Sequence, residues 1–412
     1  MRCPTDKDGP AALELQLTGS IADIAAEDWD ACANPDPERF DPFLSHAFLH
    51  ALEASGSASA EEGWAPMHLV YAAPEDGTIR AVMPLYLKGH SYGEFVFDHA
   101  WANAYHRAGG QYYPKLQSAV PFTPVTGRRL LVRPGPDEAL HRKALAGGAV
   151  AAARKLGVSS VHVTFPTEDD WSFLGDQGFL QRQDQQFWWQ NRDYDNFDGF
   201  LNDLASRKRK NLRKEREAAL SNGVTIRWLT GKDLTEEAWD AFFAFYRDTG
   251  ARKWGTPYLT RSFFSRVGEA MADQILLVMC YRDGTPIAGA LNFIGGDALY
   301  GRHWGCIEDH RFLHFEACYY QAIDFAISRG LSRVEAGAQG AHKIARGYVP
   351  KATYSAHWIA DPGFRDAIAR YLESERAAVA EDMAALEDIG PYKKDTSRFP
   401  EEESGDDEPD DR

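Results

Sequence analysis

An internal repeat constrains the fold more than any other feature of this 412-residue sequence. Three pairs of segments match in the same order along the chain: 29–48 with 239–263, 72–89 with 279–296, and 153–163 with 326–336. Chance can produce one short match, but three in the same order indicate duplication. The period is far longer than that of a solenoid repeat. The sequence therefore predicts two related globular domains in tandem.

In both copies a hairpin precedes a helix and a further strand. An Asp-Gly pair, at 76–77 and at 283–284, lies between alternating apolar residues, which is the strongest short signal for a β-hairpin. The third segment reads as an apolar-faced helix that ends at Gly157 or Gly330, because glycine readily adopts the left-handed C-cap conformation. This order predicts a mixed α/β fold with a mixed sheet.

These patterns divide the chain into four parts. We expect a first domain over 13–194, a linking helix over 195–224, a second domain over 225–391 and a disordered acidic tail over 392–412. Leucines at roughly helical spacing predict the linking helix. In the second domain, Asp361-Pro362 supplies an N-cap and a proline at the first helical position for a helix running to about Leu386.

Charge is distributed unevenly along a chain of net charge -16. Segment 401–412 (EEESGDDEPDDR) holds eight acids and one arginine, a composition that cannot bury enough apolar surface to order itself. By contrast, segment 207–216 holds seven bases and one acid. This run predicts a phosphate or nucleic-acid contact through Arg207, Lys208, Arg209, Lys210, Arg213 and Lys214. The alternative is a solvated helix face.

Several classes of protein lack support in the sequence. The five cysteines show no CxxC pair, which favours reduced thiols over a disulfide or metal framework. Charges interrupt the N-terminal segment where a signal peptide requires an apolar run, and the apolar runs are of strand length. We therefore expect a cytoplasmic protein without a transmembrane segment. A Walker loop, a GxSxG elbow, an HExxH helix and a GxGxxG fingerprint are all absent from the sequence.

The densest group of candidate catalytic residues follows the predicted strand of the second copy, in the segment EAGAQGAHK (335–343). Two glycines at a strand exit allow the backbone to approach a ligand closely. The groups available there belong to Glu335, Gln339, Gly340, His342 and Lys343. A plain glycine-rich turn with solvated side chains is the alternative.

Two further groups surround this segment. Strand alternation over 298–304 predicts that Tyr300, Arg302 and Trp304 share one face, and an arginine between aromatics favours a polar cleft over core packing. Next come His310, Arg311, His314 and Glu316. A metal site there is disfavoured, because no cysteine or third histidine follows at a supporting interval. Hydrogen bonding at a helix N-terminus is the better interpretation.

The first copy carries extra residues, 91–126, that the second lacks. The segment 97–129 interleaves aromatic and basic residues with glycine and proline, a composition typical of an ordered functional loop. We expect its polar side chains to line a ligand cleft: Tyr105, Tyr113, Lys115 and Arg128. Aromatic packing against the second domain is the alternative.

The segments YYPKLQSAVPFTPVTGRRLL, QFWWQNRDYDNFDGFLNDLASRKRKNLRKER and RHWGCIEDHRFLHFEACYYQAIDFAISRGLSRVEAGAQGAHKIARGYVP resemble the FemAB-like predicted N-acyltransferase family, over about 13–390. The resemblance implies tandem GNAT-like domains that transfer an acyl or aminoacyl group to an amine. It implies acyl-CoA or aminoacyl-tRNA as co-substrate, no permanently bound cofactor, and a small molecule or cell-envelope precursor as acceptor. Lys343 looks like the lysine that Fem enzymes carry after their final strand, although His342 stands where they have phenylalanine.

Two features depart from the family pattern. The long helical hairpin of some Fem enzymes is replaced by the basic helix, and bulky residues occupy 310–313 where acyl-CoA enzymes place glycines. In the mechanism that the resemblance implies, Lys343 and backbone N–H groups near Gly340 stabilise an oxyanion, while His342, Glu335 or the substrate accepts a proton. A noncatalytic module that binds envelope glycan or peptide, and an RNA-binding protein that uses the basic helix, remain alternatives.

Overall fold

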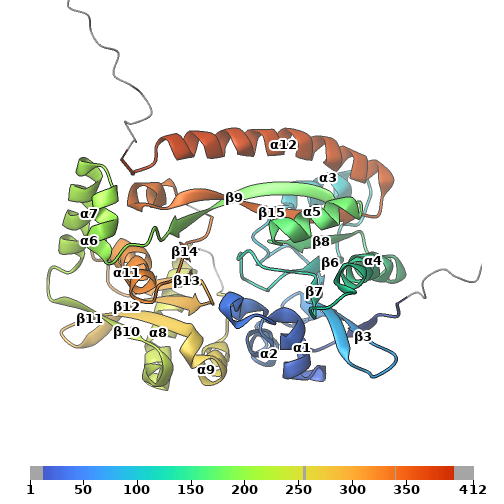
Figure 1. The fold of residues 1–412 in the computed structure, drawn as a ribbon, viewed down its shortest axis with the longest axis horizontal. Coiled ribbons are helices and arrows are strands. Elements are labelled where there is room, and N and C mark those ends of the chain that lie inside the picture. Colours follow the sequence, from blue (N-terminus) through green and yellow to red (C-terminus); the bar gives the residue numbers. More distant parts are fainter. Residues whose placement is uncertain (1–12, 254–256, 339, 394–412) are drawn as a thin grey trace, which may run out of the picture.

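A computed structural model describes residues 13–253, 257–338 and 340–393 as a mixed α/β protein (Figure 1). In these ranges, every helix falls short of the length or the apolar character that a bilayer span requires. The strands are β1 (Gln16–Thr18), β2 (Trp64–Pro66), β3 (His68–Ala72), β4 (Ile79–Met83), β5 (Tyr86–Lys88), β6 (Lys115–Ser118), β7 (Leu131–Val132), β8 (Ser160–Thr164), β9 (Leu180–Gln190), β10 (Val224–Leu229), β11 (Ile275–Arg282), β12 (Thr285–Ile294), β13 (Ala298–Cys306), β14 (Arg333–Glu335) and β15 (Val349–Ile359).

One long sheet joins the two halves of the chain. Its order is β10-β11-β12-β13-β14-β9-β15-β8-β6-β5-β2, and a smaller sheet has the order β1-β3-β4-β7. At the centre, β9 of the first half pairs with β14 of the second, and β15 of the second half pairs with β8 of the first. Figure 1 shows β9 running across the molecule between the halves. The last strand of each half therefore ties it to the other.

The helices cover both faces of this sheet. They are α1 (Ala26–Ala33), α2 (His46–Ala54), α3 (His99–Arg107), α4 (Glu138–Leu156), α5 (Glu168–Asp176), α6 (Phe197–Asp203), α7 (Ser206–Ala219), α8 (Glu236–Lys253), α9 (Arg261–Ala270), α10 (Leu313–Phe315), α11 (Gln321–Ser328) and α12 (Pro362–Asp388). A π-helical turn, η6 (Glu316–Tyr320), connects α10 directly to α11, and a 3₁₀ segment, η7 (Ala341–Arg346), precedes β15.

The repeat brings equivalent residues into contact. Helices α1 and α2 of the first half share one apolar core with α8 and α9 of the second. Phe48 and Phe263, which occupy matching positions in the two copies, pack edge to face with ring centroids 5.7 Å apart. A second core, on the other face of the second half's strands, holds α6, α7, η6 and α11.

Several local predictions from the sequence are confirmed. Both Asp-Gly turns join antiparallel strands, β3 to β4 and β11 to β12. Gly157 and Gly330 have φ of 67° and 65°, the left-handed conformation expected where these helices end. The Asp361 side chain accepts a hydrogen bond from the Phe364 N–H at the start of α12, which runs to Asp388.

Three predictions are wrong in detail. The linker forms two helices, α6 and α7, because the chain is extended at Leu204 between them. The segment expected as a functional loop contains α3 and the wholly buried strand β6. Tyr392, placed in the tail, is packed instead, with its hydroxyl donating to the Gly347 carbonyl at 2.7 Å. The remainder of the predicted tail, from residue 394, lies outside the described residues.

Candidate active site

The sheet opens between the parallel strands β13 and β14. Their pairing ends at Tyr300 and Glu335, where β14 stops while β13 continues to Cys306. Ligands commonly bind at the carboxyl ends of parallel strands. A cavity of about 120 Å³ lies at this opening; we call it the β13–β14 cavity. It is lined by Ala290, Leu291, Asn292, Gly301, Arg302, His303, Trp304, His314, Cys318, Tyr319 and Ala336.

A β-bulge shapes one wall of the cavity. Leu291 pairs with His303 and Asn292 with Gly301, so Arg302 is an extra residue in β13. Its guanidinium donates to the Phe122 carbonyl at 3.0 Å, and burial lowers its pKa to about 10. Burial likewise lowers the pKa of His303 to about 3, so His303 is neutral at physiological pH.

The bulge overturns the prediction that Tyr300, Arg302 and Trp304 share one face. Tyr300 packs on Phe43, in the core that both halves share. Trp304 packs against the opposite core, with its ring 5.4 Å from that of His314. An extra residue shifts the two-residue alternation of a strand, so side chains before and after the bulge point to opposite faces.

Lys343 secures the strand exit beside the cavity. The side chain is 4% exposed, and its Nζ donates to the carbonyls of Ala336 at 2.5 Å and Gly337 at 2.9 Å. Burial lowers the pKa of this ammonium to about 8. Lys343 therefore acts on the cavity through Ala336 and is not among its lining residues.

Gly340 and His342 continue this exit segment. Gly340 has φ of 105°, and a Cβ there would collide with the His342 ring, so only glycine fits. His342 Nε2 lies 3.0 Å from the hydroxyl of Tyr319, a cavity residue. Burial and the nearby Arg346 and Lys343 charges lower the His342 pKa. In the tautomer with its proton on Nδ1, a neutral His342 accepts a hydrogen bond from the Tyr319 hydroxyl, which itself lines the cavity. Gln339 lies outside the described residues.

Glu335 lies on the other face of the sheet from Tyr319. Its side chain is buried, and one oxygen, Oε1, accepts from Arg333 Nε at 3.0 Å. The second oxygen, Oε2, is buried and has no hydrogen-bond partner. Burial raises the pKa of this carboxyl to about 7, against the lowering effect of Arg333. A carboxyl that titrates near neutral pH and keeps one oxygen free is suited to proton transfer or to binding an amine.

Helix α7 is fixed to the elements around the cavity. Arg216 pairs with the buried Glu316 of η6 at 2.9 Å, and Glu215 pairs with Arg346 of η7 at 2.8 Å. The predicted ligand Glu316 is therefore committed to holding α7. Two other predicted ligands also lie outside the cavity. His310 Nε2 lies 2.8 Å from Glu308 Oε2, and Arg311 is exposed, with its guanidinium over the Phe312 ring.

The remaining basic residues of α7 are exposed, apart from Lys208 and Arg209, which are half-buried. Arg213 makes an exposed ion pair with Asp198. Within the described ranges, no ion pair involves the other five, which we call the basic stripe: Arg207, Lys208, Arg209, Lys210 and Lys214. These cations lie on the helix that buttresses the cavity and remain free to meet an anion.

The four first-half residues predicted to line a cleft lie elsewhere, and none lines the β13–β14 cavity. Tyr105 stacks on Phe364 of α12, and Tyr113 bonds Ser91. Lys115 is fully buried between Glu94 and Asp98, at 2.7 Å and 2.5 Å. Arg128 donates to the carbonyls of Cys32 and Ala33. Lys115 belongs to strand β6, which explains why it is interior and not part of a loop.

Sequence reasoning missed several cavity residues, notably Tyr319, Asn292 and Cys318. Tyr319 and Cys318 lie on a π-helical turn, a distortion that often marks functional sites, but its sequence reads as an ordinary apolar helix. Asn292 offered a signal, since a polar residue among the apolar residues of β12 is unusual in a buried strand.

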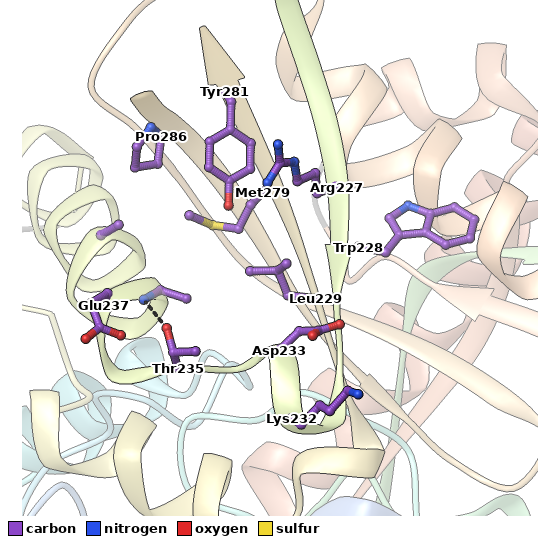
Figure 2. Close-up of a pocket in the computed structure, with 12 residues that line it drawn as sticks. Arg227, Trp228, Leu229, Lys232, Asp233, Thr235, Glu237, Met279, Tyr281 and Pro286 are labelled. Carbon is purple, nitrogen blue, oxygen red and sulfur yellow. Dashed lines mark hydrogen bonds between the residues drawn. The ribbon is translucent and has the colours of Figure 1, made fainter. Parts of the chain in front are cut away.

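A larger groove lies at the outer edge of the second half, between β10 and α8 (Figure 2). Its floor includes Leu229 and Met279, and its charged lining residues, such as Arg227 and Glu237, are exposed. The hydrogen bond drawn there, from the Ala238 N–H to Thr235 Oγ1, belongs to the helix start. Active sites typically contain buried groups with shifted pKa values, and such groups, His303 and Lys343, lie at the β13–β14 cavity and beside it. The β13–β14 cavity is therefore the stronger candidate active site.

The architecture is a mixed α/β fold whose two halves share one long sheet, and comparisons with known proteins assign the family. The chain belongs to the FemAB-like family, whose model, described as peptidoglycan biosynthesis/recognition, matches residues 20–394. No curated protein matches the sequence.

Solved structures share the fold at low sequence identity. The crystal structure of FemX has a TM-score of 0.53 at 14% identity, covering 84% of this chain and 98% of that one. The C-terminal domain of a proposed lysylphosphatidylglycerol synthetase from Agrobacterium fabrum has a TM-score of 0.52 at 10% identity, covering 85% and 96%. At a lower TM-score of 0.45, the comparison also finds a tandem GNAT protein of clavulanic acid biosynthesis, at 14% identity and covering 85% of this chain and 99% of that one.

Proposed function

We propose that this protein transfers an acyl or aminoacyl group from an activated donor to an amine of a cell-envelope precursor, and that the β13–β14 cavity receives the acyl group. The observation that carries the proposal is a cavity of about 120 Å³ at a sheet opening, with titratable groups on both faces. A space of this size suits an acyl group but is far too small for a whole acyl-CoA or aminoacyl-tRNA.

The opening itself supplies the oxyanion donors in this proposal. Beyond Tyr300, one edge of β13 faces the cavity instead of a partner strand in the described part of the chain. Attack of an amine on an ester or thioester carbonyl forms a C–N bond and a tetrahedral oxyanion, which fixed backbone N–H groups stabilise without reorganisation. Collapse of the oxyanion breaks the C–O or C–S bond of the donor, and the departing hydroxyl or thiol takes up the proton that the amine lost. Lys343 keeps this geometry by holding the Ala336 and Gly337 carbonyls.

The attacking amine must lose a proton, and His342 receives it through Tyr319. Tyr319 lines the cavity, and His342 contacts the Tyr319 hydroxyl. Glu335, on the opposite face, does not line the cavity and takes no part in this step. These roles require Tyr319 to remain protonated, and burial raises the pKa of its phenol as this requires.

The donor's phosphate groups contact the basic stripe. Acyl-CoA and aminoacyl-tRNA both carry phosphates, and the stripe lies on a helix bonded to η6 and η7 beside the cavity. Unpaired lysines and arginines bind phosphate chiefly through charge, so this contact must weaken as salt rises.

The test is to incubate the purified protein separately with radiolabelled acyl-CoA and aminoacyl-tRNA donors, each with an amine-bearing peptidoglycan-precursor peptide. We expect label to move to the peptide from one donor class, and Tyr319→Phe to slow that transfer. Saturable peptide binding without consumption of any donor would instead establish a recognition module. Salt-sensitive RNA binding without transfer would establish an RNA-binding protein.

A further inference from the structure

Two oppositely charged segments of this chain converge at one place in the fold. The basic stripe occupies α7, which begins at Ser206. The segment 401–412, which we call the acidic block, carries eight acids and one arginine. It follows residue 393, where the described part of the C-terminus ends.

The chain just before the acidic block is anchored at the start of α7. The Ala205 N–H donates to the Pro391 carbonyl at 2.9 Å, and the Lys393 N–H donates to the Asp203 carbonyl at 3.0 Å. Between them Tyr392 forms a β-bridge with Leu204, and its ring lies 4.0 Å from the Arg192 guanidinium. The exit point of the tail is therefore fixed beside the first residues of α7.

The charges on α7 are segregated along the helix. Arg216, near its C-terminal end, is bound to Glu316 and Asp324. The basic stripe lies nearer the anchored exit and has no ion-pair partner among the described residues. The helix N-cap, Ala205, also provides no side-chain hydrogen bond. The start of α7, next to the tail exit, thus carries four of the five unpaired cations, and Lys214 lies about one turn beyond them.

The connecting segment is long enough to deliver the acidic block to the stripe. Residues 394–400 span at most about 24 Å when extended and about 15 Å as a flexible chain. Helix α7 is about 21 Å long. A tether of this length raises the effective concentration of the block at the helix to the millimolar range. Reach and charge therefore both favour α7 over more distant surfaces.

We propose that the acidic block docks on the basic stripe and shields it from phosphate-bearing ligands. Eight carboxylates next to five unpaired cations neutralise the stripe, so a phosphate donor must displace the block to bind. The consequence for donor binding rests on the proposed function. The docking itself does not, because it needs neither donor nor turnover.

The direct test is zero-length carbodiimide cross-linking of the full-length protein, which joins a carboxylate to a lysine amine that it contacts. We expect mass spectrometry to find links from the acidic block to Lys208, Lys210 or Lys214. Mixing isotope-labelled with unlabelled protein shows whether the links are intramolecular. Links from the block spread over other surface lysines, such as Lys143 and Lys155 of α4, would overturn the proposal.

A binding experiment measures the shielding. The probe is a short fluorescein-labelled oligothymidylate, and the variant is a full-length chain whose eight tail acids are changed to amides: E401Q, E402Q, E403Q, D406N, D407N, E408Q, D410N and D411N. We expect this variant to bind the probe about tenfold more tightly than wild type at low salt, with the difference vanishing at high salt.

Substitution of two lysine pairs in turn distinguishes docking on the basic stripe from a general effect of the tail's charge on probe binding. In a K208Q/K210Q background the tail substitutions must no longer increase affinity. In a K143Q/K155Q background they must still do so, because α4 lies at the opposite end of the molecule from α7 (Figure 1). A gain that persists in K208Q/K210Q, or equal binding by wild type and the neutral-tail variant, would contradict the proposal.

Discussion

The two halves of the molecule carry the same sheet opening, and only the second leaves it hollow. In the first half β6 and β8 pair in parallel, with Leu116 beside Val161, as Leu299 of β13 pairs with Val334 of β14. Beyond this pairing, β13 continues to Cys306, whereas the first-half chain leaves its strand at Ser118. Its next residues, including Ala119 and Phe122, are buried in the core shared by the two halves.

A buried cation secures each strand exit, but in a different way. In the first half Arg129, which is 1% exposed, donates to the carbonyls of Thr164 at 3.0 Å and Val125 at 2.9 Å. In the second half Lys343 holds the carbonyls of Ala336 and Gly337. The second exit lies beside the β13–β14 cavity, to which Ala336, one of the residues held by Lys343, contributes. We infer that the first half is structural at this position and the second is functional.

The largest effect on transfer is expected from His342→Gln. Removing the proton acceptor should lower kcat about a hundredfold or more, since general bases typically contribute that much. A first-half control is His162→Gln, which makes the same substitution at a buried histidine enclosed by Tyr112, Ser160 and His357. Steady-state rates per folded molecule should fall only for His342→Gln. Equal losses would show that the halves do not differ in role.

Filling the cavity should have the next largest effect. Ala336→Leu adds three carbons to the wall, which should displace the acyl group and reduce kcat/KM about a hundredfold. The equivalent first-half residue, Val163, is fully buried. Val163→Leu should lower the melting temperature through overpacking and leave kcat/KM unchanged. Full activity of Ala336→Leu would show that the β13–β14 cavity does not receive the acyl group.

A smaller effect, about tenfold in kcat, is expected from Lys343→Met, because the ammonium positions the strand exit but does not line the cavity. Lys343→Arg should partly rescue the rate. Arg129→Met should instead destabilise the fold by about 1–3 kcal/mol, since it leaves buried carbonyls without donors. A loss of a hundred- to thousandfold for Lys343→Met would assign Lys343 as an oxyanion donor.

The smallest expected effect is on stability, because Glu335 makes the unfolding free energy depend on pH. Its folded pKa of about 7 lies above the usual value of a glutamate, so the native state binds this proton more tightly than the unfolded state. The stabilisation is complete at acidic pH and is lost as pH rises through about 7. Denaturant titrations should show the unfolding free energy falling between pH 5 and 7. Glu335→Gln should flatten that slope; an unchanged slope would refute the raised pKa.

Local sequence signals predicted the features that depend on neighbouring residues. The Asp-Gly hairpins, the glycines that end helices and the strand exit at 335–343 all follow from backbone preferences of a few residues. The duplication gave the mixed α/β plan, and the family resemblance gave the tandem GNAT-like architecture.

Features that depend on a partner strand escaped sequence reasoning. The bulge at Arg302 exists only relative to the register of β12, so alternation along β13 alone placed Trp304 on the wrong face. Lys115 reads as a polar loop residue until Glu94 and Asp98 enclose it. The exchange of β9 and β15 between the halves likewise depends on long-range pairing.

The most direct test of the central claim, that the acyl group enters the second half, is photolabelling with a donor whose acyl chain carries a diazirine. The donor is acyl-CoA or aminoacyl-tRNA, whichever the wild-type protein consumes. We predict that mass spectrometry will place the label on cavity residues such as Trp304, Tyr319 and Ala336. Labelling of the first-half opening, at 119–129, would contradict the account.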